Sequence, residues 1–459
     1  MVNINKIVPV ICFLAVDCVS GYTQSVEEKR APKKNVLFIV VDDLNTTLGC
    51  YDHPVVKTPN IDLLAATGIK FNHAYCNFAV CGPSRGSLLT GLLPETIGIT
   101  DNRTPLQEKL DDKTTLPNLF KQNGYYTMGL GKIFHRRSPG YGDPDSWDEY
   151  YTYKTTAKGK KGEMRNMTDG ELEWCHWRIA EGDDMDQQDG QVATKAVELI
   201  KTERENPFFL AVGFHKPHDP FVAPKKYFDM YSLSDCTPPE LPEGWEPPYD
   251  HTLPHETEVF NRFTDNDKRE FLRSYYAATS FMDAQVGKLL KALQESGQME
   301  NTLIVFFGDH GYHLGEHNWW NKVTIFEMGT RAPFIVAGGL IEEKGVTSEA
   351  MFEFIDIYPT LADFCDLERV PEYLEGKSFV NILENPMNEF RNAVQATTRR
   401  GEMQGRMVKT KKWRYVEWDK GEKGVELYDQ MNDPIEYHNL ANDVKYDSVI
   451  NEIKMLLRK

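Results

Sequence analysis

Short apolar runs alternate with amphipathic segments along most of the chain. The run at 35–43 is rich in β-branched residues and ends in two acids, and further apolar runs occur at 208–214, 302–307 and 333–337. These runs are shorter than ordinary helices, so they predict buried strands. Apolar spacings of three and four, or helix-boundary residues such as Thr58, Pro59 and Gly68, predict helices over 58–68, 116–124, 191–202, 265–297 and 352–365.

Buried strands that are separated by helices predict one main domain of the α/β class. Continuous apolar strands are typical of a mostly parallel sheet that is covered by helices on both faces. Ligands bind such sheets at the carboxyl ends of the strands. Three of the predicted strands end in DD (42–43), FHKPH (214–218) and DHG (309–311), so the polar residues fall where this architecture places a site.

The pattern changes after about residue 385. Strand-like segments at 393–398, 407–418 and 425–429 are separated by turns, and an amphipathic helix is expected over 446–457. We interpret this part as a small antiparallel sheet with a helix. Two long irregular stretches, 136–189 and 230–264, are expected to form the walls of a site, because long loops inside a compact domain are usually functional.

Composition narrows the class of protein. The chain has 459 residues, with 52 Lys and Arg against 69 Asp and Glu, so the formal net charge is −17. This acidic balance argues against a general nucleic-acid binder, whose affinity comes from cations on phosphates. A local group of cations can still bind an anionic substrate. Beyond the N-terminus, no apolar run is long enough to span a bilayer.

The first residues have the pattern of a secretory signal peptide. Lys6 precedes an apolar stretch over 7–16, and small residues follow at 20 and 21. We therefore expect residues 1–22 to be removed on export to a periplasm or the cell exterior, or to a lysosome in a eukaryote. A lipid anchor at Cys18 is an alternative against which Asp17 argues, and a buried N-terminal strand or helix is another. Six of the eight cysteines lie beyond this segment without a zinc-binding spacing, and their pairing stays open.

Two strand ends carry the first candidate chemistry. Asp42 and Asp43 end one strand, and Asp309 and His310 end another. Carboxylates that converge repel one another unless a cation lies between them, and oxygen-rich sites suit Ca²⁺ or Mg²⁺. The alternative is that one aspartate of the DD pair only caps a helical turn.

Cys81 lies just before Pro83 at the expected start of a helix, with Arg85 one turn further on. An electropositive helix start weakly suggests a nucleophile. A lone cysteine is more often a small buried apolar residue.

Together with its neighbours, this cysteine resembles the signature of a known family. CGPSR (81–85), followed by LTG (89–91), is similar to the motif of the formylglycine-dependent sulfatases. Further matching motifs are GKIFH (131–135), AVGFHKPHDPF (211–221), FGDHGYHLGEHNWWNK (307–322) and ELYDQMNDPIEYHNLA (426–441). Within that family the chain most resembles the iduronate-2-sulfatase branch. The resemblance implies an alkaline-phosphatase-like α/β catalytic domain over 30–385 and a smaller C-terminal α+β subdomain over 386–459.

The resemblance also implies a modified nucleophile and a metal. Cys81 would be oxidised to Cα-formylglycine by a sulfatase-maturing enzyme, and the aldehyde hydrate would attack sulfur. Asp42, Asp43, Asp309 and His310, together with the modified residue, would hold one divalent cation. Ca²⁺ is expected ahead of Mg²⁺, although a nitrogen ligand is unusual for calcium.

Five further residues take catalytic roles by resemblance. Arg85 would fix the aldehyde hydrate, and Lys132 and Lys322 would contact the sulfate oxygens. His135 would take a proton from the hydrate, and His215 would protonate the leaving sugar oxygen. Without the motifs, the lysines would be interpreted as solvated surface charges and the histidines as structural residues.

Other polar and aromatic residues of these motifs have open roles. Supporting or substrate-side positions are expected for His218, His313, His317 and Arg331. Trp319 and Trp320 either stack on a sugar or belong to the core. Asn45 and Asn102 begin tripeptides that fit the glycosylation pattern, and the first lies close to the predicted metal site.

The sequence as a whole predicts an exported sulfatase. By resemblance, its substrate is a sulfated oligo- or polysaccharide with 2-O-sulfated uronic acid, such as a glycosaminoglycan or ulvan. A phosphonate or phosphate monoester hydrolase with the same modified cysteine is one alternative. A sulfated-glycan-binding protein without activity is the other.

Overall fold

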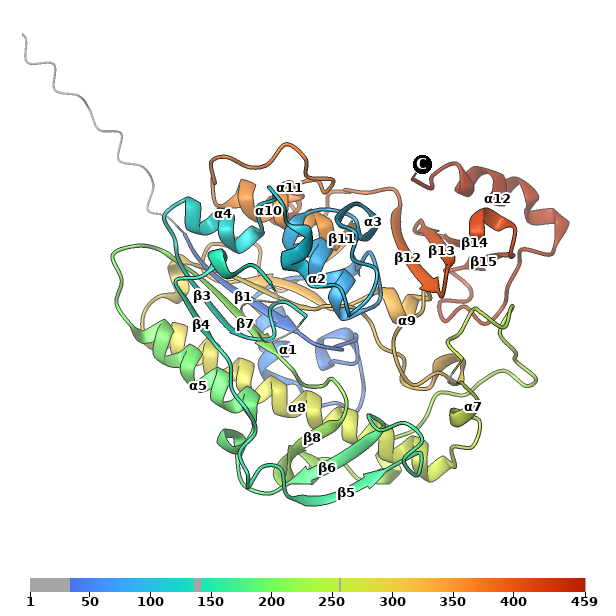
Figure 1. Cartoon of the computed structure of the whole chain (residues 1–459), viewed down its shortest axis with the longest axis horizontal. Coiled ribbons are helices and arrows are strands. Elements are labelled where there is room, and N and C mark those ends of the chain that lie inside the picture. Colours follow the sequence, from blue (N-terminus) through green and yellow to red (C-terminus); the bar gives the residue numbers. More distant parts are fainter. Residues whose placement is uncertain (1–33, 136–141, 256, 459) are drawn as a thin grey trace, which may run out of the picture. The chain divides into compact units, whose positions relative to one another are not determined.

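An eight-stranded, mostly parallel sheet organises the structure, a computed structural model that describes residues 34–135, 142–255 and 257–458 (Figure 1). The strand order is β11-β2-β10-β9-β1-β7-β3-β4. Strand β10 pairs antiparallel with β2 and β9, and the other pairings are parallel. The bounds are β1 Asn35–Val41, β2 Gly68–Tyr75, β3 Tyr126–Gly131, β4 Glu149–Tyr151, β7 Phe208–Phe214, β9 Thr302–Gly308, β10 Phe334–Ala337 and β11 Val346–Glu353. The predicted fold class is therefore confirmed.

Strand β1 lies in the middle of this sheet and is buried on both faces. Val36, Phe38 and Val40 belong to one apolar core, whereas the alternate residues Leu37 and Ile39 belong to a second core on the opposite face. The period of two along a strand explains this division, because successive side chains point to opposite faces. Both faces need an apolar cover, which is why the strand reads as a continuous apolar run.

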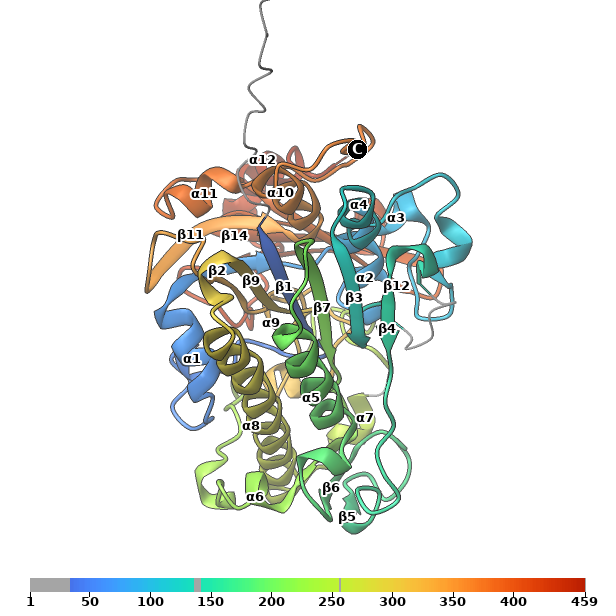
Figure 2. The ribbon, with the colours of Figure 1, turned by 90° about the vertical axis from the view of Figure 1, so that its left-hand side faces the viewer.

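Helices cover the two faces of the sheet (Figure 2). Helices α1 (Pro59–Ala66), α5 (Gln188–Lys201) and α8 (Asp265–Glu295) pack into one core, and α2 (Cys81–Thr90), α4 (Leu116–Gln122) and α10 (Ile357–Phe364) pack into the other. Helix α8 begins at a capping box in which the side chains of Thr264 and Asp267 each bond the other's backbone N–H. Its predicted start at residue 265 is therefore correct, and it ends two residues before the predicted end.

The shorter helices lie in connections between these elements. Their bounds are α3 Pro94–Ile97, α6 Lys225–Phe228, α7 Thr257–Phe260, α9 Glu327–Thr330 and α11 Val380–Glu384. No helix in the described ranges is both long and apolar enough to cross a membrane. The predicted signal peptide, 1–22, lies outside the described residues. The described cysteines are free thiols: Cys50, Cys76, Cys81, Cys175, Cys236 and Cys365.

A second sheet, antiparallel and four-stranded, is built from the C-terminal part of the chain. It consists of β12 (Val394–Arg400), β13 (Met403–Lys409), β14 (Trp413–Trp418) and β15 (Val425–Asp429), and helix α12 (Asp447–Lys454) follows. The predicted single strand over 407–418 is wrong, because a turn at 410–412 divides it into β13 and β14.

Two strands of a third sheet arise where the sequence predicted irregular structure. Strands β5 (Gly162–Asn166) and β6 (His176–Ala180) form a hairpin, and β8 (Phe221–Pro224) adds to β6 in parallel. The predicted helix over 352–365 is also partly wrong, because its first two residues complete β11. Both errors concern strand residues without clear alternation, which periodicity does not distinguish from loops or helix starts.

Asp283 of α8 provides a test of how the helices are fixed to one another. Its buried carboxylate accepts the backbone N–H groups of Asn60 at 3.1 Å and Ile61 at 2.8 Å, which belong to the first turn of α1. The substitution Asp283→Ala leaves these N–H groups without an acceptor, so we expect a loss of about 2 kcal/mol in the free energy of unfolding. Urea denaturation measures this loss. Glu295→Ala, which removes an exposed carboxylate of the same helix, is the control and should change the stability much less. Equal effects of the two substitutions would contradict this role of Asp283.

Candidate active site

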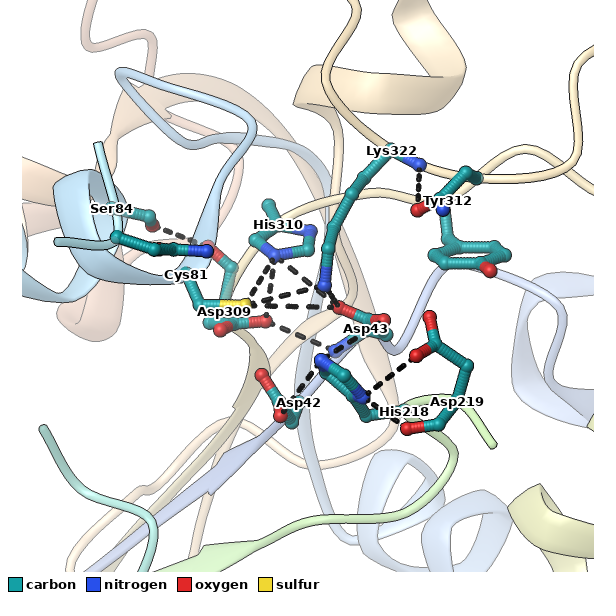
Figure 3. Close-up of polar contacts among 12 residues, drawn as sticks. Asp42, Asp43, Cys81, Ser84, His218, Asp219, Asp309, His310, Tyr312 and Lys322 are labelled. Carbon is teal, nitrogen blue, oxygen red and sulfur yellow. Dashed lines mark hydrogen bonds and ion pairs between the residues drawn. The ribbon is translucent and has the colours of Figure 1, made fainter. Parts of the chain in front are cut away.

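Three aspartates and a histidine meet at the carboxyl edge of the eight-stranded sheet (Figure 3). Asp42 and Asp43 follow β1 directly, and Asp309 and His310 follow β9, the parallel neighbour of β1. The backbone N–H of Asp43 donates to Asp309 Oδ1 at 3.1 Å, and all four residues are fully buried. The parallel register of β1 and β9 therefore brings together the residues that the sequence placed at two separate strand ends.

Cys81 is the first residue of α2 and belongs to the same cluster. Its Sγ lies 3.4 Å from His310 Nε2, 3.3 Å from Lys322 Nζ and 4.0 Å from Asp43 Oδ1. The thiol is fully buried, and burial together with the charge of Asp42 raises its pKa. The unmodified thiol is therefore neutral, and its place at a helix start does not make it a thiolate.

The first turn of α2 is fixed to the sheet by polar contacts that sequence reasoning missed. The backbone N–H of Gly82 donates to Asn102 Oδ1 at 2.8 Å, and the Ser84 hydroxyl donates to the backbone oxygen of Asp309. A Cβ atom at position 82 would meet Asn102 Oδ1 at 2.8 Å, so this glycine permits the close approach. Asn102, which the sequence marks only as a glycosylation tripeptide, thus helps to position Cys81. Asn45, in the other tripeptide, is buried with its amide bonded to Tyr312, so it is not accessible to a glycan.

Three cationic side chains face the three carboxylates. Arg85 Nε donates to Asp309 Oδ2 at 2.8 Å, and its Nη2 lies 3.4 Å from Asp42 Oδ1. Lys132 forms an ion pair with Asp42, and Lys322 forms one with Asp43. The formal charges of these six groups cancel, which offsets much of the cost of burying the carboxylates.

The pKa values follow from these pairs. Burial raises the pKa of Asp42, but Lys132 and the nearby histidines lower it more, so it lies well below its usual range. Burial lowers the pKa of Lys322, and the charge of Asp43 outweighs this, so its pKa lies well above its usual range. Both groups are therefore charged at neutral pH.

The cluster also has the donor atoms of a divalent cation site. His310 Nδ1 donates to the backbone oxygen of Gly311 at 2.8 Å, because a carbonyl only accepts, so Nε2 is the ring nitrogen that faces the cluster. Ligand atoms of Asp42, Asp43, Cys81 and His310 all lie within 4.8 Å of one another. Asp43 Oδ2 is buried and has no hydrogen-bond partner among the described residues. His310 Nε2 and Asp43 Oδ2 can each offer a lone pair, and a cation bound between them would accept both.

Two histidines lie on the other side of Asp42. His215 Nδ1 is 3.4 Å from Asp42 Oδ2, and the ring of His218 stacks on that of His215 at 4.9 Å. His218 Nε2 is 3.9 Å from carboxylate oxygens of both Asp42 and Asp43, so this histidine belongs to the cluster. Asp219 lies beside it, and burial raises the pKa of this carboxyl to about 7. The sequence left the role of His218 open and gave no sign of Asp219.

His135 and Lys132 follow β3, at the same edge of the sheet. Burial, together with the charge of Lys132, lowers the pKa of His135 to about 3, so the ring is neutral at pH 7. A small pocket is lined by His135, Arg85 and Gly82, which places this ring beside the start of α2. The structure thus brings together every residue that the sequence assigned to the metal and to catalysis.

The segment that carries Lys322 is held from three directions. Trp319 Nε1 donates to the Lys322 backbone oxygen at 2.7 Å, and Arg400 Nη2 of β12 donates to the Val323 oxygen at 2.7 Å. The Val323 N–H donates to the Ala79 oxygen at 3.1 Å. Val323 has φ +73°, a strained value for a β-branched residue, which persists only where the surroundings fix it.

Other candidates from the sequence form the walls behind this segment. Trp319 and Trp320 are fully buried and pack on Phe260 and Phe271, so core packing is their role here. His313 Nε2 bonds Thr324 Oγ1 at 2.7 Å, His317 stacks on Phe326 at 4.0 Å, and Arg331 lies 4.0 Å from Glu327. These residues support the site through packing and hydrogen bonds.

Comparison with known proteins identifies relatives over most of the chain. Residues 34–367 match the family described as sulfatase, and residues 315–459 match the C-terminal part of N-sulphoglucosamine sulphohydrolase. A sulfatase of Formosa agariphila is 35% identical over 94% of this chain and 88% of its own. Human iduronate 2-sulfatase is 32% identical over 77% of this chain and 73% of its own.

Solved structures share the fold. A protein in complex with its substrate D-glucosamine-2-N,6-O-disulfate superposes with a TM-score of 0.75 over 93% of this chain and 97% of its own, at 23% identity. This likeness confirms the α/β sheet and the separate C-terminal sheet.

The cation site makes a prediction that does not depend on turnover. After treatment with EDTA and dialysis, added Ca²⁺ should raise the melting temperature, because binding to the folded state alone stabilises it. Asp43→Asn removes the charge of the carboxylate whose Oδ2 has no hydrogen-bond partner among the described residues, so the calcium-dependent shift should fall to near zero. Asp229→Asn, which changes an exposed carboxylate of the segment after α6, should keep the full shift. An equal shift in Asp43→Asn and in the unsubstituted protein would exclude this cluster as the cation site.

Proposed function

The chain belongs to the sulfatase family, and from this premise we propose that it hydrolyses sulfate esters of 2-O-sulfated uronic acid in a polysaccharide. Sulfatases are sulfuric ester hydrolases. The observation that carries the proposal is the place of Cys81 at the start of α2, with Sγ beside His310 and Lys322 and within the carboxylate cluster. Glycosaminoglycans and ulvan both contain sulfated sugars and uronic acids, and the likeness to human iduronate 2-sulfatase supports the uronate.

Asp42, Asp43, Asp309, His310 and the modified Cys81 would hold the cation, for which Ca²⁺ is the first candidate. A bound divalent cation would stabilise negative charge on the nucleophile and on the transferring group. The carboxylates of Asp42 and Asp43 would at the same time keep Lys132 and Lys322 at the site through their ion pairs. Calcium favours the oxygen ligands, and the oxidised side chain would replace sulfur by oxygen.

Cys81 would be oxidised to Cα-formylglycine by a sulfatase-maturing enzyme. The hydrated aldehyde would supply an oxygen nucleophile and would release sulfate when the carbonyl re-forms. The unmodified thiol is neutral and fully buried, and an S-sulfated cysteine would have no such route of release. Arg85, already bonded to Asp309 and to backbone oxygens after β3, would orient this side chain.

Lysines and histidines supply the remaining chemistry. Lys322 Nζ lies 3.3 Å from Cys81 Sγ, so it would reach a sulfate oxygen next to the nucleophile, and Lys132 would do so from the side of Asp42. His135, held neutral by burial and by Lys132, would accept the proton of the hydrate. His215, whose Nδ1 lies 3.4 Å from Asp42 Oδ2, would donate a proton to the leaving sugar oxygen.

Export and a two-part organisation complete the proposal. Residues 1–22 would be cleaved as a signal peptide, and the mature protein would act in a periplasm or outside the cell, or in a lysosome. The catalytic domain would span 30–385 and the C-terminal subdomain 386–459. The separate sheet β12–β15 supports this boundary.

The test of the function compares sulfate with phosphate. The protein, co-expressed with a maturing enzyme, should show a higher kcat/KM on 4-nitrophenyl sulfate than on 4-nitrophenyl phosphate. A preference for phosphate would favour a phosphate or phosphonate monoester hydrolase instead. Cys81→Ala is the control, which should lose turnover with both esters while it still binds a sulfated oligosaccharide. A peptide mass across residue 81 confirms the oxidation.

The proposed acid makes a second prediction. His215→Ala should lower kcat by about 10²–10⁴ on a sugar sulfate, whose leaving oxygen needs a proton. On 4-nitrophenyl sulfate, whose leaving group is stable as an anion, the loss should be much smaller. His438→Ala, which removes an exposed histidine paired with Asp433, is the control and should lower kcat on neither ester. Equal losses on both substrates would remove His215 from the acid role.

A further inference from the structure

A cationic segment stands out in this acidic chain. Residues 154–161, with the sequence KTTAKGKK, contain four lysines and no acidic residue, whereas the formal net charge of the chain is −17. They precede β5, the first strand of the third sheet. A group of like charges usually lies on a solvated surface, so its position relative to the site decides what it can do.

The third sheet is joined directly to the candidate active site. The segment that follows β7 contains His215 and His218 and leads into β8. Strand β8 pairs in parallel with β6, where Arg178 lies opposite Val222. The connection between these two histidines and the third sheet is therefore only a few residues long. The hairpin β5–β6 therefore lies close to His215, at one side of the candidate active site.

A cavity of about 430 Å³ lies between this sheet and the start of α5. Its lining includes His215, and it also includes the three basic side chains Lys160, His176 and Arg178. This volume is within the range of about 300–1,000 Å³ that is typical of small-molecule sites. His215 thus forms part of the wall of a space that is large enough for a sugar.

The balance of charge in this cavity is positive. No carboxylate of the described residues forms an ion pair with Lys160 or Arg178, and Arg178 Nη2 contacts Met164 Sδ at 2.9 Å. Asp189 also lines the cavity, but its Oδ2 accepts the backbone N–H groups of His215 and Lys216. Arginine and lysine that are not neutralised by acids are the usual partners of carboxylates and sulfates.

We propose that this cavity is a subsite for an anionic group of the glycan, bound by Lys160, His176 and Arg178. The inference rests on the proposed function, in which the sugar oxygen leaves towards His215. The sugar ring then enters the cavity that His215 lines. The anionic group is a carboxylate or a sulfate on the ring that carries the ester or on its neighbour. The protein therefore prefers glycans that carry several anionic groups to small esters whose only anionic group is the sulfate.

The test compares two substrates in variants of the subsite. Arg178→Gln and Lys160→Ala are each assayed on a 2-O-sulfated uronate disaccharide from heparin and on 4-nitrophenyl sulfate. Each substitution should lower kcat/KM on the disaccharide by a factor about ten times the factor on the aryl ester. This extra loss should appear mainly as a higher KM. Lys160 is exposed, so its substitution does not endanger folding. Lys291→Ala, which removes an exposed lysine near the C-terminal end of α8, is the matched control and should leave kcat/KM unchanged on both substrates.

Binding separates this inference from the proposed function. Calorimetry with the Cys81→Ala protein measures the affinity of the disaccharide with and without Arg178→Gln, at low and high salt. A carboxyl-reduced disaccharide identifies the anion. If Arg178→Gln no longer lowers the affinity for the reduced disaccharide, the subsite binds the carboxylate; if it still lowers that affinity, the subsite binds a sulfate. Equal losses on both esters, or no loss of affinity, would overturn the subsite. Hydrolysis of 4-nitrophenyl sulfate without binding of the disaccharide would also overturn it while leaving the sulfatase function intact.

Discussion

The structure depends on the burial of three carboxylates at one edge of a parallel sheet. Asp42, Asp43 and Asp309 are fully buried within one cluster, and uncompensated buried charge costs several kcal/mol for each group. The compensation comes from three separate parts of the fold: Arg85 from α2, Lys132 from the end of β3 and Lys322 from the segment after β9. The strand order, the position of α2 and the course of that segment therefore all contribute to neutralising the same buried carboxylates.

The C-terminal sheet takes part in this compensation from a distance. Arg400 of β12 bonds the Val323 carbonyl next to Lys322, and the fully buried Arg414 of β14 forms ion pairs with Glu327 and Glu436. Glu327 begins α9, just after the Lys322 segment. These contacts, of which the Arg414 pairs are buried and the Arg400 bond is partly buried, hold the segment in a conformation that includes the strained Val323. The second sheet thus helps to determine where the Lys322 ammonium lies, although it contributes no residue to the cluster itself.

The sequence predicted the parts of the fold whose residues are buried on a regular period. Strands β1, β7 and β9 and helix α8 were predicted because full burial gives continuous apolar runs and amphipathic helices give spacings of three and four. Strands β5 and β6 were missed because they are short and partly exposed, and β8 because four residues are too few to show a period. Asp42, Asp43, Asp309 and His310 were predicted from their positions at two strand ends, and Cys81 and the cationic residues were assigned by resemblance to a family signature. Asn102 and Ser84 were not predicted, because each acts through a contact distant in sequence, such as Asn102 with Gly82. Asp219 was not predicted either, although it is the next residue after His218.

The cancellation of charge in the cluster bears on how an anionic ester would be bound. Three carboxylates and three cationic side chains leave no net charge for a sulfate to meet, and the lysines are already engaged by Asp42 and Asp43. A divalent cation among the donor atoms that lie within 4.8 Å of one another would make the cluster net positive. It would also weaken the hold of the carboxylates on the lysines, since each oxygen would then share its charge with the cation. In the proposed function, cation binding and ester binding therefore favour each other, because the same carboxylates serve both.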